Sequence, residues 1–141
     1  MMIRILFVCS GNSVRSQMAE AFARTLSDGQ FEIRSAGIYA AGVHPVAAAS
    51  MKEVGIDISG QSSTILDNSL INWADHLVTL CGNARENCPP IPKSVKTNHW
   101  DIINPDRLYP SEEARRQGYA RVRDIIRRQV ESILAELRRR D

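Results

Sequence analysis

Ile3-Arg4-Ile5-Leu6-Phe7-Val8-Cys9-Ser10-Gly11-Asn12-Ser13-Val14-Arg15-Ser16 is the stretch of sequence that decides the fold. Its first part, residues 3–8, is almost continuously apolar, which is typical of a strand buried on both faces of a parallel sheet. Residues 9–15 read as a turn. Apolar residues then recur at helical spacing: Met18, Ala19, Phe22, Ala23 and Leu26. A buried strand, a turn and a helix in direct succession predict the first βα unit of an α/β protein.

The later segments continue this alternation of strands and helices. We expect strands over 31–35, 74–80 and 95–99, and a helix over 45–54 that starts at a proline. A long closing helix is indicated by an apolar stripe of Val122, Ile125, Ile126, Val130, Ile133, Leu134 and Leu137. The 141 residues suit one ordinary domain, so we predict a single α/β domain spanning 1–141 with a mostly parallel sheet.

Composition excludes several classes of protein. The chain is 43% hydrophobic and 24% charged, as in soluble globular proteins, and its net charge of +2 gives no case for binding nucleic acid. No apolar run approaches the ~20 residues that span a membrane. Three cysteines, an odd number, fit a secreted disulfide scaffold badly. We therefore expect a cytoplasmic protein with free thiols, and a monomer.

The turn after the first strand carries a cysteine and an arginine separated by five residues, Cys9 and Arg15. Five residues wrapped into a ring turn their backbone N–H groups inward and form an anion nest, and the following helix N-terminus adds a favourable dipole. Arg15 can clamp two oxygens of a tetrahedral oxyanion with its planar fork. The predicted oxyanion-binding residues are Ser10, Gly11, Asn12, Ser13, Val14, Arg15 and Ser16.

The same loop prepares a nucleophile. Its positive field favours the thiolate form of Cys9, and Ser16 can donate a hydrogen bond to that sulfur. Gly11 lets the backbone approach closely, and Asn12 tolerates left-handed geometry. A Cys-x5-Arg pattern by itself also fits a structural cysteine beside a surface arginine. The buried strand before it and the helix after it favour the functional interpretation.

Residues 8–16 resemble the signature of the low-molecular-weight protein tyrosine phosphatases and of their relatives, the thioredoxin-coupled arsenate reductases. The continuation Gln17-Met18-Ala19-Glu20 and the later Ser35-Ala36-Gly37 are also similar, and the resemblance covers nearly the whole chain. It implies a four-stranded parallel sheet flanked by helices, with the oxyanion loop at the carboxyl edge of the sheet.

A pair of cysteines later in the chain distinguishes the arsenate reductases from the phosphatases. Cys81 and Cys88 enclose six residues, and this segment resembles the redox segment of the thioredoxin-coupled arsenate reductases. Cys9 and Cys81 both follow apolar strands, so in a parallel sheet they can meet at one edge despite 71 intervening residues. Two inert core cysteines are the alternative, since free cysteine is commonly buried. A structural zinc site fits poorly, because such sites use closely spaced pairs and four ligands, so we predict no metal.

The resemblance implies a reaction. Arsenate is attacked by Cys9, Cys81 then forms a disulfide with Cys9, and Cys88 takes over that disulfide for reduction by thioredoxin. The residues leave glutaredoxin or another thiol open as the reductant. Two other functions stay open: a low-molecular-weight protein tyrosine phosphatase, and a non-catalytic protein that holds an oxyanion or trivalent arsenic on its three thiols.

Three positions depart from the family pattern: Val14, Asn104 and Thr64. Val14 stands where relatives often carry another cysteine, and Asn104 stands where the family carries the aspartate that protonates the leaving group. Asp101 and Asp106 are the nearby candidates for that acid.

Some related reductases bind potassium beside the loop. Asn12, Glu20 and Ser35 match that site, but Thr64 replaces its further carboxylate. We expect these three residues to brace the loop through hydrogen bonds. We expect no cofactor beyond a weakly held monovalent cation near Asn12.

Overall fold

Four parallel strands form the centre of the protein in the computed structural model, which describes residues 2–140. They are β1 (Ile3–Cys9), β2 (Phe31–Gly37), β3 (His76–Thr79) and β4 (Lys96–His99), in the spatial order β2-β1-β3-β4. The central strand β1 is completely buried from Ile5 to Val8, which explains its apolar sequence. The expected fold class, a four-stranded parallel sheet flanked by helices, is confirmed.

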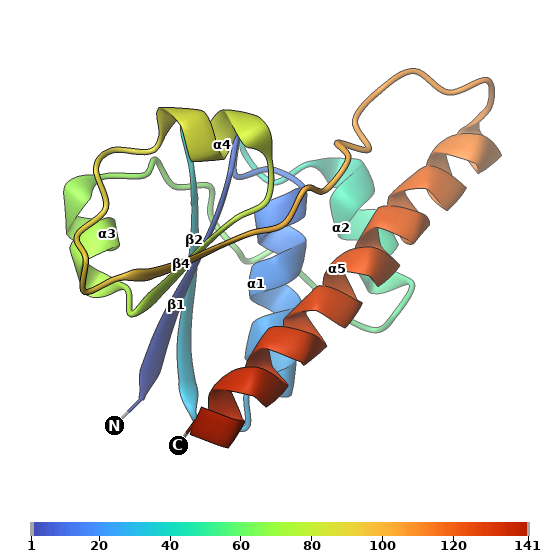
Figure 1. The fold of residues 1–141 in the computed structure, drawn as a ribbon. Helices are drawn as coiled ribbons and strands as arrows, with labels where there is room; N and C mark the ends of the chain where they lie inside the picture. The colour runs from blue at the N-terminus through green and yellow to red at the C-terminus, as the bar shows by residue number, and fades with distance from the viewer. Residues whose placement is uncertain (1, 141) are drawn as a thin grey trace.

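In the described part of the chain, five helices surround this sheet: α1 (Arg15–Leu26), α2 (Pro45–Lys52), α3 (Asn68–Trp73), α4 (Gly82–Asn87) and α5 (Glu112–Arg140). Figure 1 shows α1, α2 and α5 on one side of the sheet and α3 on the other, with α4 above the carboxyl ends of the strands. Within residues 2–140, none of the helices combines the length and the apolarity that crossing a bilayer requires.

Helix α5 covers α1 and α2 with an apolar stripe. Val122, Ile126, Val130, Ile133, Leu134 and Leu137 are buried, as the periodicity predicts. Ile125, which we assigned to the stripe, is 39% exposed. It points about 100° away from Ile126 around the helix axis, toward the solvent edge of the stripe.

Several elements differ from the sequence predictions: β2 runs two residues further, to Gly37, and β4 begins one residue later, at Lys96. Helix α2 ends at Lys52, before the predicted residue 54, and Gly55 completes its termination with a left-handed φ of 81°. Strand β3 is shorter than predicted, because Ala74 caps the end of α3. Helix α3 was not predicted: it buries only Ile71, so its sequence has no helical periodicity to detect.

The strand register brings the loops after β1, β2 and β3 to one edge of the sheet. Cys9 lies beside Gly37, and Val8 lies beside Thr79. A side chain at Gly37 would collide with the backbone of Gly11 and Asn12. The glycine therefore allows the end of β2 to lie directly against the turn that follows β1.

Candidate active site

The turn after β1 is held in shape through its backbone carbonyls. All six carbonyls from Cys9 to Val14 accept hydrogen bonds from the surrounding protein: the backbone donors are Ile38, Tyr39, Ala41, His44 and Met18, and the side-chain donors are Ser63 and Gln17. The N–H and C=O groups of a peptide point in opposite directions, so carbonyls drawn outward leave the N–H groups facing the centre of the ring. The loop is therefore a preformed anion nest.

The start of α1 completes this nest. Its N-cap residue, Val14, makes no side-chain capping bond, which leaves the first N–H groups of the helix available to an anion. Arg15 is buried and donates from Nη1 to the Ile102 carbonyl at 3.0 Å. That bond fixes the guanidinium, whose other N–H groups remain free for two oxygens of a ligand.

Asn12 braces the loop from behind through its side chain. It is completely buried in the left-handed region, with φ 47°. Its Nδ2 donates to Ser16 Oγ at 2.7 Å and to Ser35 Oγ at 2.9 Å, while its Oδ1 accepts from the Thr64 N–H at 2.8 Å. The amide orientation is therefore fixed by partners of opposite kind.

This orientation determines where the Ser16 proton goes. Because Ser16 Oγ accepts from Asn12, its own hydrogen is free for Cys9 Sγ, which lies 2.9 Å away. A hydroxyl hydrogen bond to the sulfur stabilises the thiolate, the nucleophilic form of cysteine. The structure thus places the side chains of Asn12 and Ser16 behind the loop rather than in its cavity.

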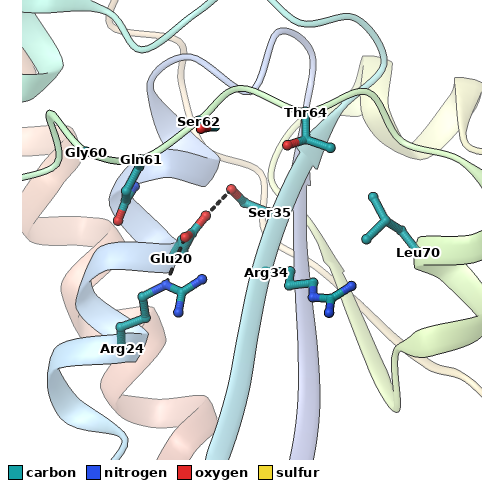
Figure 2. A pocket seen from close by; sticks show the side chains of 9 residues that line it. All are labelled: Glu20, Arg24, Arg34, Ser35, Gly60, Gln61, Ser62, Thr64 and Leu70. Carbon is teal, nitrogen blue, oxygen red and sulfur yellow. Dashed lines mark hydrogen bonds and ion pairs between the residues drawn. The ribbon is translucent and has the colours of Figure 1, made fainter.

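The network ends on Glu20, at the wall of a second cavity of about 460 Å³. Ser35 donates to Glu20 Oε1 at 2.5 Å, and Arg24 pairs with Glu20 Oε2 at 2.8 Å, as Figure 2 shows. Thr64 lines the same cavity. Asn12, Ser35 and Glu20 are therefore joined by hydrogen bonds behind the loop, as expected.

A small cavity opens above the nucleophile. Its volume is about 100 Å³, and it is lined by Cys9, Ser10, Gly11, Ser13, Val14, Arg15, Tyr39, Ala41, Asn104 and Asp106. Pockets for drug-sized ligands usually measure ~300 Å³ or more. This cavity suits a small inorganic oxyanion held over the sulfur of Cys9.

Cys81 lies at the rim of this loop. It is buried, and its Sγ is 3.4 Å from the hydroxyl of Ser10, the residue after the nucleophile. Asn83 donates to the same hydroxyl at 2.9 Å. Cys81 is also the N-cap of α4 and accepts from the Ala84 N–H at 3.4 Å. The sulfur of Cys81 is therefore held between the loop, at Ser10, and the start of α4, at Ala84.

Cys88 lies at the opposite end of α4, where it is the C-cap residue. It lines a separate, largely apolar cavity of about 140 Å³ with Leu77 and Ile91. Burial raises the pKa of the Cys88 thiol, which keeps it in the neutral form. All three cysteines are free in this structure.

The two acid candidates are placed differently. Asp106 and Asn104 both line the small cavity, whereas Asp101 is exposed and does not. Within residues 2–140, no group of three histidine, cysteine, aspartate or glutamate side chains is arranged to hold a metal ion.

Sequence reasoning missed the residues that hold the loop from outside. Ser63 and Gln61 lie in a polar coil, and His44 immediately precedes the helix predicted over 45–54. A coil that supplies single hydrogen bonds has no periodicity, so no sequence signal marks these residues.

Comparisons with known proteins agree with this geometry. The chain is 48% identical over 122 residues to the arsenate reductase of Bacillus subtilis (strain 168), covering 86% of this chain and 88% of that protein. A solved arsenate reductase in the phosphate binding state superposes with a TM-score of 0.78 at 35% identity, covering 96% of this chain and 98% of that one. The YwlE arginine phosphatase from Geobacillus stearothermophilus superposes with a TM-score of 0.80 at 26% identity, covering 98% and 94%.

Residues 4–141 match the family described as low molecular weight phosphotyrosine protein phosphatase. Because that match spans nearly the whole chain, the protein belongs to the low-molecular-weight phosphotyrosine protein phosphatase family.

Proposed function

We propose that this protein reduces arsenate to arsenite with Cys9 as the nucleophile, and that thioredoxin recycles it through Cys81 and Cys88. One observation carries the proposal: a second buried thiol, Cys81, lies at the rim of the anion loop, with its Sγ 3.4 Å from Ser10 Oγ. Hydrolysis of a phosphate ester needs the loop, its nucleophile and an acid for the leaving group, but no second thiol. A neighbouring thiol is required only when the reaction must end in a disulfide.

The first step is a substitution at arsenic. Arsenate occupies the small cavity, held by the inward N–H groups and by Arg15. The Cys9 thiolate attacks, an arsenic–sulfur bond forms and one oxygen leaves as water. Ser16 supports the thiolate until it attacks, through its 2.9 Å contact to the sulfur.

The second and third steps are thiolate exchanges. The Cys81 thiolate attacks Cys9 Sγ, the arsenic–sulfur electron pair moves to arsenic, and arsenite departs. This leaves a Cys9–Cys81 disulfide. Cys88 then attacks Cys81, releases the Cys9 thiolate and forms a Cys81–Cys88 disulfide, which the dithiol of thioredoxin reduces.

The third step requires α4 to unwind. Cys81 and Cys88 flank this six-residue helix, and at 1.5 Å per residue their Cα atoms are roughly 10 Å apart. A disulfide needs Cα atoms within ~7 Å. Of the residues in α4 only Ala84 is buried, so little packing opposes unwinding. The raised pKa of the Cys88 thiol keeps that residue unreactive until the segment moves.

The test is arsenate-dependent consumption of NADPH with thioredoxin and thioredoxin reductase supplied. Cys9→Ser, Cys81→Ser and Cys88→Ser should each abolish turnover. The variants should stop at different steps after one equivalent of arsenate. Cys88→Ser should accumulate a Cys9–Cys81 disulfide, which peptide mass spectrometry detects. Cys81→Ser should form no disulfide and release no arsenite.

Two outcomes would overturn the proposal. Cys81→Ser turning over at the parental rate would remove the thiol relay. A parent that is inactive with arsenate but steadily hydrolyses an aryl phosphate would identify a phosphatase of the same family instead.

A further inference from the structure

The cavity above Cys9 contains an aspartate outside the family position. Asn104, which occupies that position, uses its Oδ1 to accept the Asp106 N–H at 3.0 Å. This bond closes an Asx turn around Pro105 and carries Asp106 to the cavity wall. Asn104 is therefore a turn residue here, and Asp106 is the only carboxylate among the described residues that line the cavity.

His44 is aimed at this carboxylate from the start of α2. Its Nδ1 accepts the Val46 N–H at 3.1 Å as the helix N-cap, so the ring hydrogen must be on Nε2. Nε2 lies 3.7 Å from Asp106 Oδ1, an ion-pair distance that is longer than a hydrogen bond. The backbone N–H of His44 also donates to the Ser13 carbonyl at 3.1 Å, which ties this histidine to the anion loop.

Two tyrosines hold the pair in place. The Tyr119 ring packs 5.7 Å from the His44 ring, centre to centre. Burial, with a further contribution from the Asp106 charge, raises the pKa of Tyr119 to about 12, so it stays a neutral phenol. Tyr109 donates from its hydroxyl to the Pro105 carbonyl at 2.9 Å, inside the turn that presents Asp106.

We propose that Asp106 is the catalytic acid of the anion loop and that His44 is its positioning residue. This inference deepens the proposed arsenate reduction and rests on it for the substrate. The neutral His44 ring directs its Nε2–H toward the Asp106 carboxylate, from 3.7 Å, and limits the directions in which that carboxylate can turn. The negative charge of a bound oxyanion favours the neutral carboxyl form of Asp106, which takes its proton from solvent.

The proton count shows where this acid matters. The Cys9 thiolate, a monohydrogen arsenate dianion and one proton give the Cys9–arsenic adduct and one water. The arsenic–sulfur bond forms, one arsenic–oxygen bond breaks, and arsenic is not yet reduced. Asp106 gives its proton to the departing oxygen and regains one from solvent. Dihydrogen arsenate carries both protons itself, so Asp106 serves the dianion.

The test compares Asp106→Asn with Asp101→Asn, an exposed aspartate outside the cavity. Asp106→Asn should lower kcat for arsenate on the order of 10²-fold, the usual contribution of a general acid, with little change in KM. Asp101→Asn should keep parental kcat. Asn104→Asp combined with Asp106→Asn should recover most of the loss, because an aspartate at 104 keeps the turn and returns an acid to the cavity.

Two substitutions of His44 separate its roles. Asn at 44 keeps the helix cap but lacks a group at the Nε2 position, whereas Gln reaches the Nε2 position but caps poorly. His44→Asn should therefore lower kcat with parental stability and KM. His44→Gln should lower the melting temperature yet keep a higher kcat than His44→Asn. The reverse order would assign His44 a merely structural role.

Hydrolysis of aryl phosphates tests the acid independently of arsenate reduction. If the acid acts in the loop, Asp106→Asn should slow phenyl phosphate more than p-nitrophenyl phosphate, because phenolate is the poorer leaving group. A parent inactive with arsenate that shows this contrast would refute the arsenate reaction and keep the acid. The assignment of Asp106 as the acid would be refuted if Asp106→Asn reduced arsenate with the parental kcat. It would also be refuted if the parent turned over neither arsenate nor an aryl phosphate.

Discussion

Asn12 combines two tasks that usually fall to different residues. Its left-handed backbone, φ 47°, bends the anion loop, and its side chain orients Ser16 toward the nucleophile. Glycine would permit the same backbone without the side chain. The asparagine therefore links the shape of the loop to the reactivity of Cys9.

Replacing Asn12 by Gly and by Ala separates these tasks. Both variants lose the bonds to Ser16 and Ser35, so both should slow the alkylation of Cys9 by iodoacetamide. Ala adds a Cβ in the left-handed region, which costs about 1–2 kcal/mol. Urea denaturation should thus show Asn12→Ala less stable than Asn12→Gly by that amount. Equal stabilities would mean that the loop relaxes out of the left-handed conformation.

For single residues, the sequence predicted the local properties of the loop: backbone conformation and hydrogen bonds between near neighbours. The left-handed tendency of Asn12, and Ser16 as a donor to Cys9, are both local properties of the residue type and its spacing. The long-range partners could not be predicted. Ser63 reaches the loop across about fifty residues of chain, and His44 meets Asp106 only because two loops converge in space.

Helix α4 is the element whose stability should control recycling. It is six residues long and starts with Gly82, a residue that disfavours helix. A Cβ at Gly82 would meet nothing within 4 Å, and Gly82 is not among the left-handed glycines. Alanine at this position therefore stabilises the helix without strain.

Gly82→Ala should stabilise α4 by about 0.5–1 kcal/mol. Unwinding of α4 then becomes harder, and thioredoxin-coupled turnover should fall roughly two- to fivefold if that step limits the rate. Formation of the Cys9–Cys81 disulfide in a single turnover should be unchanged, because it precedes unwinding. Gly60→Ala, another unhindered position, is the matched control. An unchanged steady-state rate would show that Cys88 reaches Cys81 without melting α4.

Elements with strong periodicity were predictable and short ones were not. The seven-residue core strand β1 and the 29-residue helix α5 bury repeated apolar positions, which the sequence displays directly. Helices α3 and α4 each bury a single residue. Their caps, Asp67 and Cys81, hold them in place, and a lone cap in a polar segment does not distinguish a helix from a turn.

For the whole molecule, a preformed anion loop predicts stabilisation by oxyanions. Phosphate, sulfate or arsenate at 100 times its dissociation constant should stabilise the fold by about 2.7 kcal/mol, because only the folded loop binds it. The melting temperature should rise accordingly in the parent. Arg15→Ala should show a much smaller rise, since it lacks the clamp. An equal rise in both proteins would place the anion elsewhere.

Alkaline stability gives a second prediction at this scale. Burial raises the pKa of Tyr119 to about 12, above the value of 10.0 for an unperturbed tyrosine. The unfolded chain therefore loses this proton first as the pH rises. The contribution of Tyr119 to the free energy of unfolding is complete below pH 10 and decreases up to about pH 12.

Urea denaturation of the parent and Tyr119→Phe across this pH range measures that contribution. The phenylalanine variant should lose less stability between pH 10 and 12, because it has no phenol to titrate. Parallel stability curves for the two proteins would show that the Tyr119 phenol ionises as easily in the folded chain as in the unfolded one.

The outward-held carbonyls of the anion loop have a consequence for life in a phosphate-rich environment. A loop with one fixed shape binds phosphate and arsenate at the same site, since both are tetrahedral anions. Only arsenic can then accept the electron pair from sulfur. Abundant phosphate would thus act as a competitive inhibitor, and the rate of arsenate reduction would follow the ratio of the two anions rather than the arsenate concentration alone.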